Sequence, residues 1–413
     1  MPDSAMKSFA TEVVQRLRDA GHISLFAGGC VRDSLLGLAP KDFDVATNAR
    51  PEEVRKIFGR HRTIPVGQSF GVITVLGPRP HQVEVATFRS DGEYSDGRHP
   101  DEVTFSSPEE DALRRDFTVN GMFFDPLKQE VIDYVGGQQD LAAGIIRAIG
   151  SPQQRIEEDH LRMLRAIRFA ATYSFQIESG TLDAVRDHHQ QIDTVSQERV
   201  TQELERMLRH NNRGRSLDLL KESLLLAHVL PAVDVVADDE PRWRRLLAIA
   251  DVLADVRWST VLALLIGPEG ADIKDVSREC RRLKVSNEVR SSVEWLSRHL
   301  QRLKHADRMR FSELQPLLIN TEIDQALLVL DGVATVDGDP KAHLERCREL
   351  LQLEPELLDP EPLIRGEDLV AAGIAPGPAF SKLIKLVRDA QLDGQIDSKA
   401  QALDLVRQQQ GES

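Results

Sequence analysis

Short apolar or alternating runs dominate the first 147 or so residues of the chain. Seven of these runs predict strands, namely SLFAGG, FDVAT, RTIPVG, GVITVLG, QVEVATF, FTVNGMFF and EVIDYV. VRDSLLGL and PEEVRKIF predict helices, the second with Pro51 in its first turn. From Pro152 onward strand patterns almost vanish, and apolar residues recur at helical spacing in LRMLRAIRFAATY, QERVTQELERMLR and RSLDLLKESLLLAHVL. The pattern therefore predicts an α/β head followed by an all-helical remainder.

The composition is that of a soluble globular protein, with 41% hydrophobic and 29% charged residues among 413. No apolar run approaches the roughly 20 residues that span a bilayer, and the N-terminal segment is typical of a polar amphipathic helix rather than a signal peptide. Cys30, Cys280 and Cys347 lie far apart, without CxxC spacing. We therefore expect a cytoplasmic protein with no membrane association, disulfide framework or zinc site.

The formal net charge of −14 is unusual for a protein that would bind nucleic acid, because phosphate contacts need cations. The distribution of charge matters more than its sum. Between Arg242 and Arg310, fifteen Lys and Arg residues stand against nine carboxylates, while acidic residues gather elsewhere, including Glu345 to Asp359. The Arg242–Arg310 stretch is thus a candidate basic surface, although ordinary solvated helix faces have the same composition.

Two carboxylates in the segment KDFDVAT indicate a metal site. Asp42 and Asp44 are two residues apart in a predicted strand, so both point to one face, while Phe43 and Val45 point to the packed face. Adjacent carboxylates repel each other, and a divalent cation with a preference for oxygen ligands, such as Mg²⁺, would compensate them. Glu84, between Val83 and Val85 in QVEVATF, is a candidate third ligand or metal support, and an exposed strand glutamate is the alternative.

A glycine turn precedes the carboxylates. Gly28 and Gly29 join a predicted strand to a helix that begins near Val31. Glycines at such a turn let backbone N–H groups approach a phosphate, and Arg32 could pair with the same anion. GG-x-VRD followed closely by Asp-x-Asp is a far more specific signal than either motif alone.

These segments together resemble the class II tRNA nucleotidyltransferases and bacterial poly(A) polymerases of the polymerase-β superfamily. GGCVRDSLLG with DFDVAT resembles the family's motif A, and RRDFTVNGMFF resembles its motif B. RSDGEYSDGRHPDEVTF resembles the flexible loop between them, to which Asp91 to Arg98 would belong. EEDHLRMLRAIRF resembles the family's EDxxR motif, and VSQERVTQELERML resembles the motif after it. The matches cover about residues 24 to 210 in the family's order, and PLIRGEDLVAAGIAPGPAFSKLIKLV resembles its tail.

The resemblance implies an α+β fold with a polymerase-β-like head, built on a small mixed β-sheet with flanking helices, at residues 1–147. An elongated all-α neck (148–210), body (211–350) and tail (351–413) would follow, with body and tail binding tRNA. The implied activity is template-independent, Mg²⁺-dependent addition of CMP and AMP to the 3′ end of tRNA, which is CCA addition and repair. The implied partners are the acceptor arm and 3′ end of tRNA, with CTP and ATP, and no obligate protein partner is expected.

The resemblance also assigns roles to single residues. Asp42 and Asp44 would be catalytic metal ligands, with Glu84 supporting them. The residues that would bind the nucleotide are Gly28, Gly29 and Arg32 at its phosphates, Arg115, Asp116 and Asn120 beside the nucleotide and its ribose, Asp159 and Arg162 at its base, and Arg165 and Arg168 at the triphosphate. The family often has Asn-Ala where this chain has Asn120-Gly121.

Asp159 and Arg162 are three residues apart on a predicted helix, so we expect them to be neighbours on its surface. An intrahelical ion pair is the simplest interpretation of that spacing. As a base-reading pair, however, the carboxylate would accept from the amino group of cytosine or adenine, and the guanidinium would donate to the ring nitrogen. Uracil and guanine reverse this pattern, and the resulting mispairing would reject UTP and GTP.

Several alternatives remain at this point. Within the same chemistry, the chain could be a bacterial poly(A) polymerase, or add only A or only CC; PVGQSFGVITV looks more like the CCA-adding subgroup. A metal-dependent phosphohydrolase of the HD type needs His-Asp doublets, and VLALLIGPEGADI has none, while His188 and His189 look like an exposed helix end. A catalytically inactive RNA-binding protein would not need the intact acidic pair.

Overall fold

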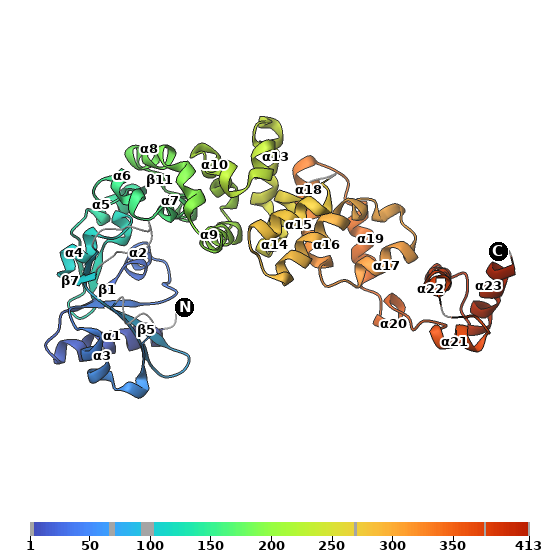
Figure 1. The fold of residues 1–413 in the computed structure, drawn as a ribbon, viewed down its shortest axis with the longest axis horizontal. Coiled ribbons are helices and arrows are strands. Elements are labelled where there is room, and N and C mark those ends of the chain that lie inside the picture. The colour runs from blue at the N-terminus through green and yellow to red at the C-terminus, as the bar shows by residue number, and fades with distance from the viewer. Residues whose placement is uncertain (1–3, 66–70, 92–102, 268–270, 376, 412–413) are drawn as a thin grey trace. The chain divides into compact units, whose positions relative to one another are not determined.

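The computed structural model describes residues 4–65, 71–91, 103–267, 271–375 and 377–411. The chain divides into two compact units, Met1–Asp234 and Val235–Ser413. The first contains the β-sheets, and the described residues of the second are helical or in loops (Figure 1). The predicted α+β class, with a small mixed sheet near the N-terminus and helices after it, is confirmed. The finer division into head, neck, body and tail stays a prediction.

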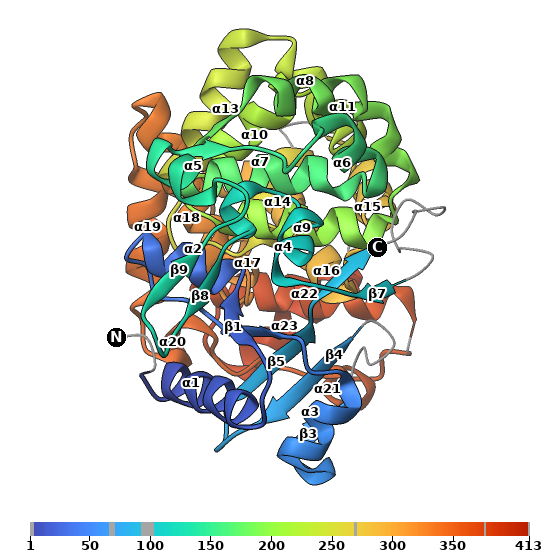
Figure 2. The ribbon, with the colours of Figure 1, turned by 90° about the vertical axis from the view of Figure 1, so that its left-hand side faces the viewer.

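The central sheet of the first unit has seven strands in the order β3-β4-β5-β2-β1-β8-β9, and Figure 2 shows them side by side. β2 and β5 are parallel, and all other neighbours in this sheet are antiparallel. The strands are β1 (Ser24–Ala27), β2 (Asp44–Thr47), β3 (Thr63–Ile64), β4 (Val72–Leu76), β5 (Gln82–Thr87), β8 (Phe123–Asp125) and β9 (Glu130–Ile132). Two further pairs form small sheets, β6 (Arg89–Asp91) with β7 (Val103–Phe105), and β10 (Ile145–Ile146) with β11 (Gln176–Ile177).

Alternation along the strands separates a packed face from a face with exposed acids. Val45, Val83 and Val85 are buried, whereas Asp44 and Glu84 are exposed, as the period of two requires. Helices α1 (Ser4–Asp19) and α3 (Pro51–Phe58) pack against these strands (Figure 1). The Ser24 hydroxyl donates to the Val14 carbonyl at 2.9 Å, which attaches α1 to β1 on the packed face.

Strand direction fixes which turns lie near the acidic residues. β2 begins at Asp44, and Val45 pairs with Val85 of the parallel strand β5, so the N-terminal ends of both strands lie together. The β4–β5 turn, residues 77–81, is at this same end of the sheet. The β8–β9 turn, residues 126–129, is at the opposite end, because Phe123 at the start of β8 pairs with Ala27 at the end of β1.

One predicted strand is mostly wrong. In FTVNGMFF, Thr118–Asn120 form a 3-10 helix, and only Phe123 and Phe124 enter β8. The Thr118 hydroxyl donates to Asp140 at 2.7 Å, and the Asn120 amide donates to Asp116 at 3.0 Å. These side-chain bonds hold a turn where the apolar pattern alone favours extended backbone.

The helices of the first unit after the sheet include two that coincide with their predicted runs, α7 (Leu161–Tyr173) and α9 (Gln197–Arg209). They pack against each other through faces that include Leu164, Ile167 and Leu204, all fully buried. The remaining α-helices among the described residues are α2 (Gly29–Leu35), α4 (Pro108–Leu113), α5 (Gly137–Ala143), α6 (Pro152–Glu158), α8 (Ser179–Asp187), α10 (Arg213–Glu222) and α11 (Leu226–Val229), and the 3-10 helix η4 spans His189–Thr194. Helix α12 (Pro231–Ala237) spans the boundary between the units.

The second unit consists of helices and loops in its described residues. Its helices are α13 (Glu240–Val252), α14 (Trp258–Ile266), α15 (Ile273–Arg282), α16 (Asn287–Leu303), α17 (Phe311–Leu318), α18 (Ile323–Asp337), α19 (Ala342–Leu351), α20 (Pro355–Leu358), α21 (Gly366–Ala371), α22 (Pro378–Leu392) and α23 (Lys399–Gly411). Many cations of the Arg242–Arg310 stretch form ion pairs within the unit, such as Arg245 with Asp337 at 2.5 Å. Across the described residues, no helix combines the length and apolarity needed to cross a membrane.

Candidate active site

A pocket of about 550 Å³ in the first unit brings together most of the residues that the sequence singles out. Every residue expected to bind the nucleotide lines it, together with one of the expected metal ligands: Gly28, Gly29, Arg32, Asp44, Arg115, Asp116, Asn120, Asp159, Arg162, Arg165 and Arg168. Asp42 and Glu84 are not among the lining residues. The lining also includes Arg114, Leu161, Phe169 and Arg199, which the sequence did not single out as site residues.

Asp44 lines this pocket, and two further exposed carboxylates lie close enough to repel its charge, namely Glu84 in β5 and Asp42, which stands two residues before the start of β2. Asp42, Asp44 and Glu84 are exposed, and Asp44 and Glu84 each stand one position before the paired residues Val45 and Val85. Loss of water around the Asp44 carboxylate, and then repulsion from Asp42 and Glu84, raise its pKa to about 6, although Arg115 lowers it. The carboxylate is thus reached by solvent from the pocket while protein surrounds its other sides.

These carboxylates fit a divalent cation of the Mg²⁺ type. Within the described part of the chain, no group of three or more His, Cys, Asp or Glu residues is arranged to hold a metal ion. Mg²⁺ does not need such a cage, because it commonly binds one or two carboxylates and completes its octahedron with water and substrate phosphates. Loss of water raises the pKa of Asp44 most, and repulsion from Asp42 and Glu84 raises it further; a bound cation would relieve this repulsion.

The turn at Gly28 requires glycine. Gly28 has φ +70°, and a Cβ there would lie 2.9 Å from Nη1 of Arg115. Its N–H donates to the Met122 carbonyl at 3.2 Å, which fixes the turn to the strand region that follows the 3-10 helix. The backbone therefore passes the pocket without a side chain between it and Arg115.

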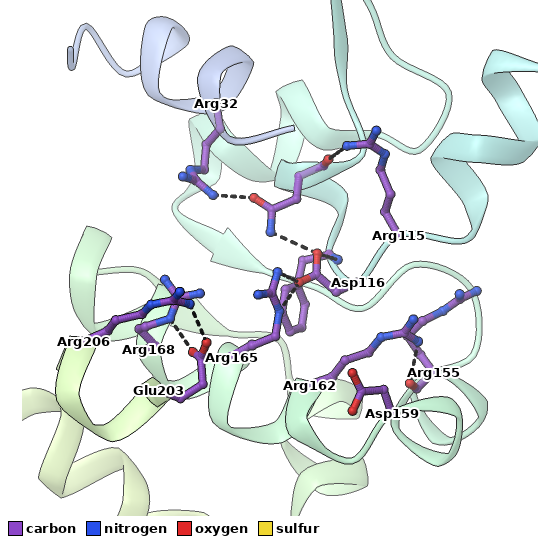
Figure 3. A network of polar contacts seen from close by, with 12 residues as sticks. Arg32, Arg115, Asp116, Arg155, Asp159, Arg162, Arg165, Arg168, Glu203 and Arg206 are labelled. Atoms are coloured by element: carbon purple, nitrogen blue, oxygen red, sulfur yellow. Dashed lines mark hydrogen bonds and ion pairs between the residues drawn. The ribbon is translucent and has the colours of Figure 1, made fainter. Parts of the chain in front are cut away.

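Arg32 is buried and already has several partners. Its guanidinium donates to the Asn120 side-chain oxygen and forms an ion pair with Asp33 at 2.8 Å. It also lies over the rings of Phe169 and Tyr173, at 5.0 and 4.6 Å from their centroids. These contacts hold the cation at the wall of the pocket, and Figure 3 shows Arg32 with its hydrogen bond to the side-chain oxygen.

Asp116 organises the neighbouring part of the wall, because the Asn120 side chain bonds both to it and to Arg32. Its carboxylate accepts from Nε and Nη2 of Arg165 at 2.8 and 2.6 Å, from the Asn120 amide at 3.0 Å and from the Phe117 N–H at 2.8 Å (Figure 3). Burial by itself would raise the pKa of Asp116, but Arg165 and the hydrogen bonds lower it to about 2. Asp116 is therefore ionised, and its contacts hold Arg165 and the 3-10 helix in place rather than leaving a carboxylate free for a ligand.

A second buried acid holds Arg168. Glu203 of α9 has a side chain only 3% exposed and accepts from Nε of Arg168 at 2.5 Å and from Arg206 at 2.8 Å. The Arg168 guanidinium also lies 4.0 Å from the centre of the Phe169 ring. Arg168 is consequently a fixed cation that packing and an ion pair aim along the pocket wall (Figure 3).

The expected neighbourhood of Asp159 and Arg162 on one helix is wrong. Helix α6 ends at Glu158, Asp159 has extended backbone with φ −152°, and α7 begins at Leu161. Asp159 pairs with Arg199 of α9 at 2.7 Å, and Arg162 pairs with Glu158 at 2.5 Å. Both side chains nevertheless line the same pocket, so the two groups meet there without bonding to each other.

The residues that the sequence missed lack a local signature. Arg199 and Glu203 lie in VSQERVTQELERML, which the resemblance covers, but their partners Asp159 and Arg168 are 40 and 35 residues away. Phe169 looks like an ordinary core position of an amphipathic helix, and it is only 5% exposed. A buried acid on a helix opposite an arginine-rich helix is the signal that could have indicated Glu203.

The charge of the pocket favours a polyanionic ligand with a polar head group. Seven arginines and three aspartates line it. Residues 92–102, which include most of the segment expected to be a flexible loop, lie outside the described residues. A mixed sheet with exposed carboxylates beside an arginine-lined pocket is the arrangement of a nucleotidyltransferase.

Comparison with known proteins agrees with this class. The model described as "Poly A polymerase head domain" matches residues 24–147, and one described as "Probable RNA and SrmB- binding site of polymerase A" matches 174–236. A model for domain 2 of tRNA nucleotidyltransferases matches residues 257–406.

Curated relatives cover nearly the whole chain. A CCA-adding enzyme of Streptococcus mutans is 33% identical over 97% of this chain and 96% of its own length. One of Enterococcus faecalis is 34% identical over 95% of this chain and 94% of its own. The solved structure of the Bacillus stearothermophilus CCA-adding enzyme in complex with CTP aligns with a TM-score of 0.79 at 29% identity, covering 98% of both chains. This chain belongs to the family of CCA-adding enzymes.

Proposed function

We propose that this protein adds C and A to the 3′ end of tRNA, using CTP and ATP without a nucleic-acid template, to build or repair the CCA end. The observation that carries the proposal is the single pocket that Asp44 shares with Asp159 and Arg162. A catalytic carboxylate and two groups able to recognise a base thus face one ligand, of the size and charge of a nucleoside triphosphate. The family's relatives, which are named for CCA addition, support this substrate.

Asp42 and Asp44 would hold Mg²⁺, with Glu84 supporting them from the neighbouring strand. Bound there, the metal would supply a Lewis acid for the α-phosphate and a counter-charge for the departing pyrophosphate. The protein's own part is positioning, because phosphoryl transfer needs little covalent chemistry from side chains. The RNA 3′ hydroxyl attacks the α-phosphorus, and the bond to the pyrophosphate oxygen breaks.

Asp159 and Arg162 would read the base, and their present partners leave room for this. Asp159 accepts from the Leu161 N–H and from Arg199, yet each carboxylate oxygen has two acceptor sites. Arg162 uses Nη1 for the Arg155 carbonyl and Glu158, so its Nε and Nη2 donors remain for a ring nitrogen. The amino group and ring nitrogen of cytosine or adenine match the Asp159 acceptor and the Arg162 donor. Uracil and guanine present a carbonyl oxygen and a ring N–H instead, which match neither group.

The arginines would bind the triphosphate at the other end of the nucleotide. Arg32, Arg165 and Arg168 surround the Phe169 ring, and each is fixed by a carboxylate behind it. Gly28 and Gly29 allow the chain to approach the phosphates closely, with Arg115, Asp116 and Asn120 beside the sugar. Preorganised cations of this kind stabilise charge without reorganising during the reaction.

The helices after the head would bind tRNA through its phosphates. Two of the matching family models, at 174–236 and 257–406, describe an RNA-binding site and a tRNA nucleotidyltransferase domain. Such binding should weaken as the salt concentration rises. The protein would act in the cytoplasm. A reducing compartment agrees with its three buried cysteines, which form no disulfide.

An incorporation assay separates the proposal from its alternatives. Purified protein is incubated with tRNA ending before CCA, after C, or after CC, and with each NTP separately. The proposal predicts C from CTP on the first two ends, A from ATP on the third, and nothing from UTP or GTP. Repeated A addition on all ends would indicate a poly(A) polymerase, and loss of either C or A would indicate a partial activity. No incorporation on any end would refute nucleotidyl transfer.

A further inference from the structure

A long segment of the head carries cations and no acids. Between Glu53 and Glu84 the chain has no Asp or Glu, although 66 of its 413 residues are acidic. The Lys and Arg residues of this segment are Arg55, Lys56, Arg60, Arg62 and Arg79. None of them lines the pocket described above, so the nucleotide site does not account for this local excess of charge.

Folding gathers three of these cations at one end of the sheet. Arg60 and Arg62 bound the short 3-10 helix η1 (Arg60–Arg62), which leads directly into β3. Nε of Arg62 donates to the Leu76 carbonyl at 3.2 Å, and Leu76 is the last residue of β4. Arg79 is in the β4–β5 turn that follows, closed by the His81 N–H on the Pro78 carbonyl at 2.8 Å. We call Arg60, Arg62 and Arg79 the basic strand end.

The basic strand end is exposed and not neutralised. Arg60, Arg62 and Arg79 are all exposed to solvent. Within the described residues, no carboxylate forms an ion pair with any of them, in contrast to exposed arginines elsewhere such as Arg244 with Glu240. Their positive charge is therefore directed to solvent, where a polyanion can reach it.

The basic strand end is at the same end of the sheet as the carboxylates that we propose to be catalytic. The β4–β5 turn and Asp44 are at the same end of the sheet, and Glu84 of β5 lies between them. The pocket is on the other side of Asp44, where Gly28 follows β1. In-line attack needs the RNA hydroxyl and the leaving pyrophosphate on opposite sides of the α-phosphorus. With the nucleotide in the pocket, the β5 side of Asp44 is left for the RNA.

We propose that the basic strand end binds backbone phosphates of the RNA next to its reacting 3′ end. The inference rests on the proposed function and extends it to a substrate contact within the head. RNA fits better than an acidic protein, because the cations flank the catalytic carboxylates and the RNA must come to these carboxylates. Phosphate contacts here hold the terminal hydroxyl while the incoming nucleotide changes.

The test uses matched turn cations of the same sheet. Arg79→Gln removes a cation from the β4–β5 turn, and Lys128→Gln removes an exposed cation from the β8–β9 turn at the opposite end. The measurements are the Kd for tRNA lacking CCA at several salt concentrations, and KM for that tRNA and for CTP. Arg79→Gln should raise Kd and KM for tRNA about three- to fivefold and leave KM for CTP unchanged. Arg60→Gln combined with Arg79→Gln should reduce the slope of log Kd against log salt by roughly 0.7 for each RNA phosphate that the protein no longer neutralises.

Each outcome decides the proposal. Equal behaviour of the Arg79→Gln and Lys128→Gln proteins would overturn it and leave an acidic protein as the partner to seek. A parallel rise in KM for CTP would overturn it too, because the residue would then act on the nucleotide pocket. If the wild-type protein binds tRNA but incorporates nothing, the proposed function fails, and the Kd comparison still decides whether this surface binds RNA. Equal melting temperatures of the variants exclude a folding defect.

Discussion

Asp44 lies where the sheet and the pocket meet, and its environment opposes the negative charge of its carboxylate. Burial and the charges of Asp42 and Glu84 raise the pKa of its carboxyl to about 6. Asp42 and Glu84 repel the charge of Asp44, and the cation that we propose for this site would relieve that repulsion. Strand alternation made the exposure of Asp44 and the burial of Val45 predictable, whereas Asp42 stands two residues before β2 and is not placed by strand geometry.

Replacement of Asp44 by Asn should remove catalysis and leave RNA binding largely intact. Loss of a ligand to the metal should lower kcat at least about 100-fold, because charge stabilisation at the phosphate is lost. Single-turnover incorporation and the Kd for tRNA are measured side by side, with Glu12→Gln on the exposed face of α1 as a control that keeps wild-type rates. An equal loss of tRNA binding would show that Asp44 is a structural acid.

Asp116 provides a pH-dependent contribution to stability. Its folded pKa of about 2 is below the ordinary value of 3.8, so its contribution is complete above that value and is lost as the pH falls toward 2. The shift corresponds to about 2 kcal/mol. Asp116→Asn should therefore weaken the acid dependence of the free energy of unfolding between pH 5 and 3, measured by urea titration. Asp183→Asn, which removes an exposed carboxylate on α8, is the matched comparison. The same acid dependence in both variants would contradict this role.

At the level of elements, helical periodicity located α7 and α9 but not the break before α7. The Asp159 carboxylate accepts the Leu161 N–H at 3.1 Å, so it satisfies a donor at the start of α7 from outside the helix. Asp favours such positions over helix interiors because its side chain competes for backbone N–H groups. The apolar pattern is insensitive to this competition, and EEDHLRMLRAIRF therefore looked like one uninterrupted helix.

The contact between α7 and α9 depends on a buried ion pair that no local pattern reveals. Glu203→Ala would leave Arg168 without its carboxylate, at a cost of about 3 kcal/mol in the free energy of unfolding. The control is Glu205→Ala on the same helix, whose partner Arg209 is 64% exposed, with an expected cost of about 0.5 kcal/mol or less. Urea unfolding measures both variants. Equal, small effects would mean that packing rather than the ion pair joins the helices.

At the scale of the whole molecule, the net charge of −14 hides a segregation of charge. The acid-free segment 54–83 supplies β3 and β4 at one edge of the central sheet, and arginines line the pocket. The fifteen cations of the Arg242–Arg310 stretch looked like a basic surface, yet many are held by nearby acids such as Glu322, which pairs with Arg257 at 2.5 Å. Sequence composition does not reveal the pairing of Arg245 or Arg257, because their partners Asp337 and Glu322 follow 92 and 65 residues later.

The pattern of residues in the sequence also could not predict that the candidate site residues lie close together in space. Asp44, Asp116, and the pair Asp159 and Arg168 come from three separate motifs, and only the order of these motifs within a known family indicated that they belong together. Arg199 is an example of a residue that the sequence did not indicate. It pairs with Asp159, which is 40 residues away in the chain. Motifs thus indicated the lining of the pocket, while the support behind it required the fold.

Substrate choice by the intact protein tests the central claim most directly. The measurement is the ratio of kcat/KM for CTP to that for UTP, on tRNA lacking CCA, for wild type, Asp159→Ala and the control Glu157→Ala, whose side chain is 60% exposed. If Asp159 reads the base above the catalytic carboxylates, Asp159→Ala lowers this ratio at least about 100-fold, and the control does not. A slower Asp159→Ala enzyme that still rejects UTP as strongly as wild type would contradict the account.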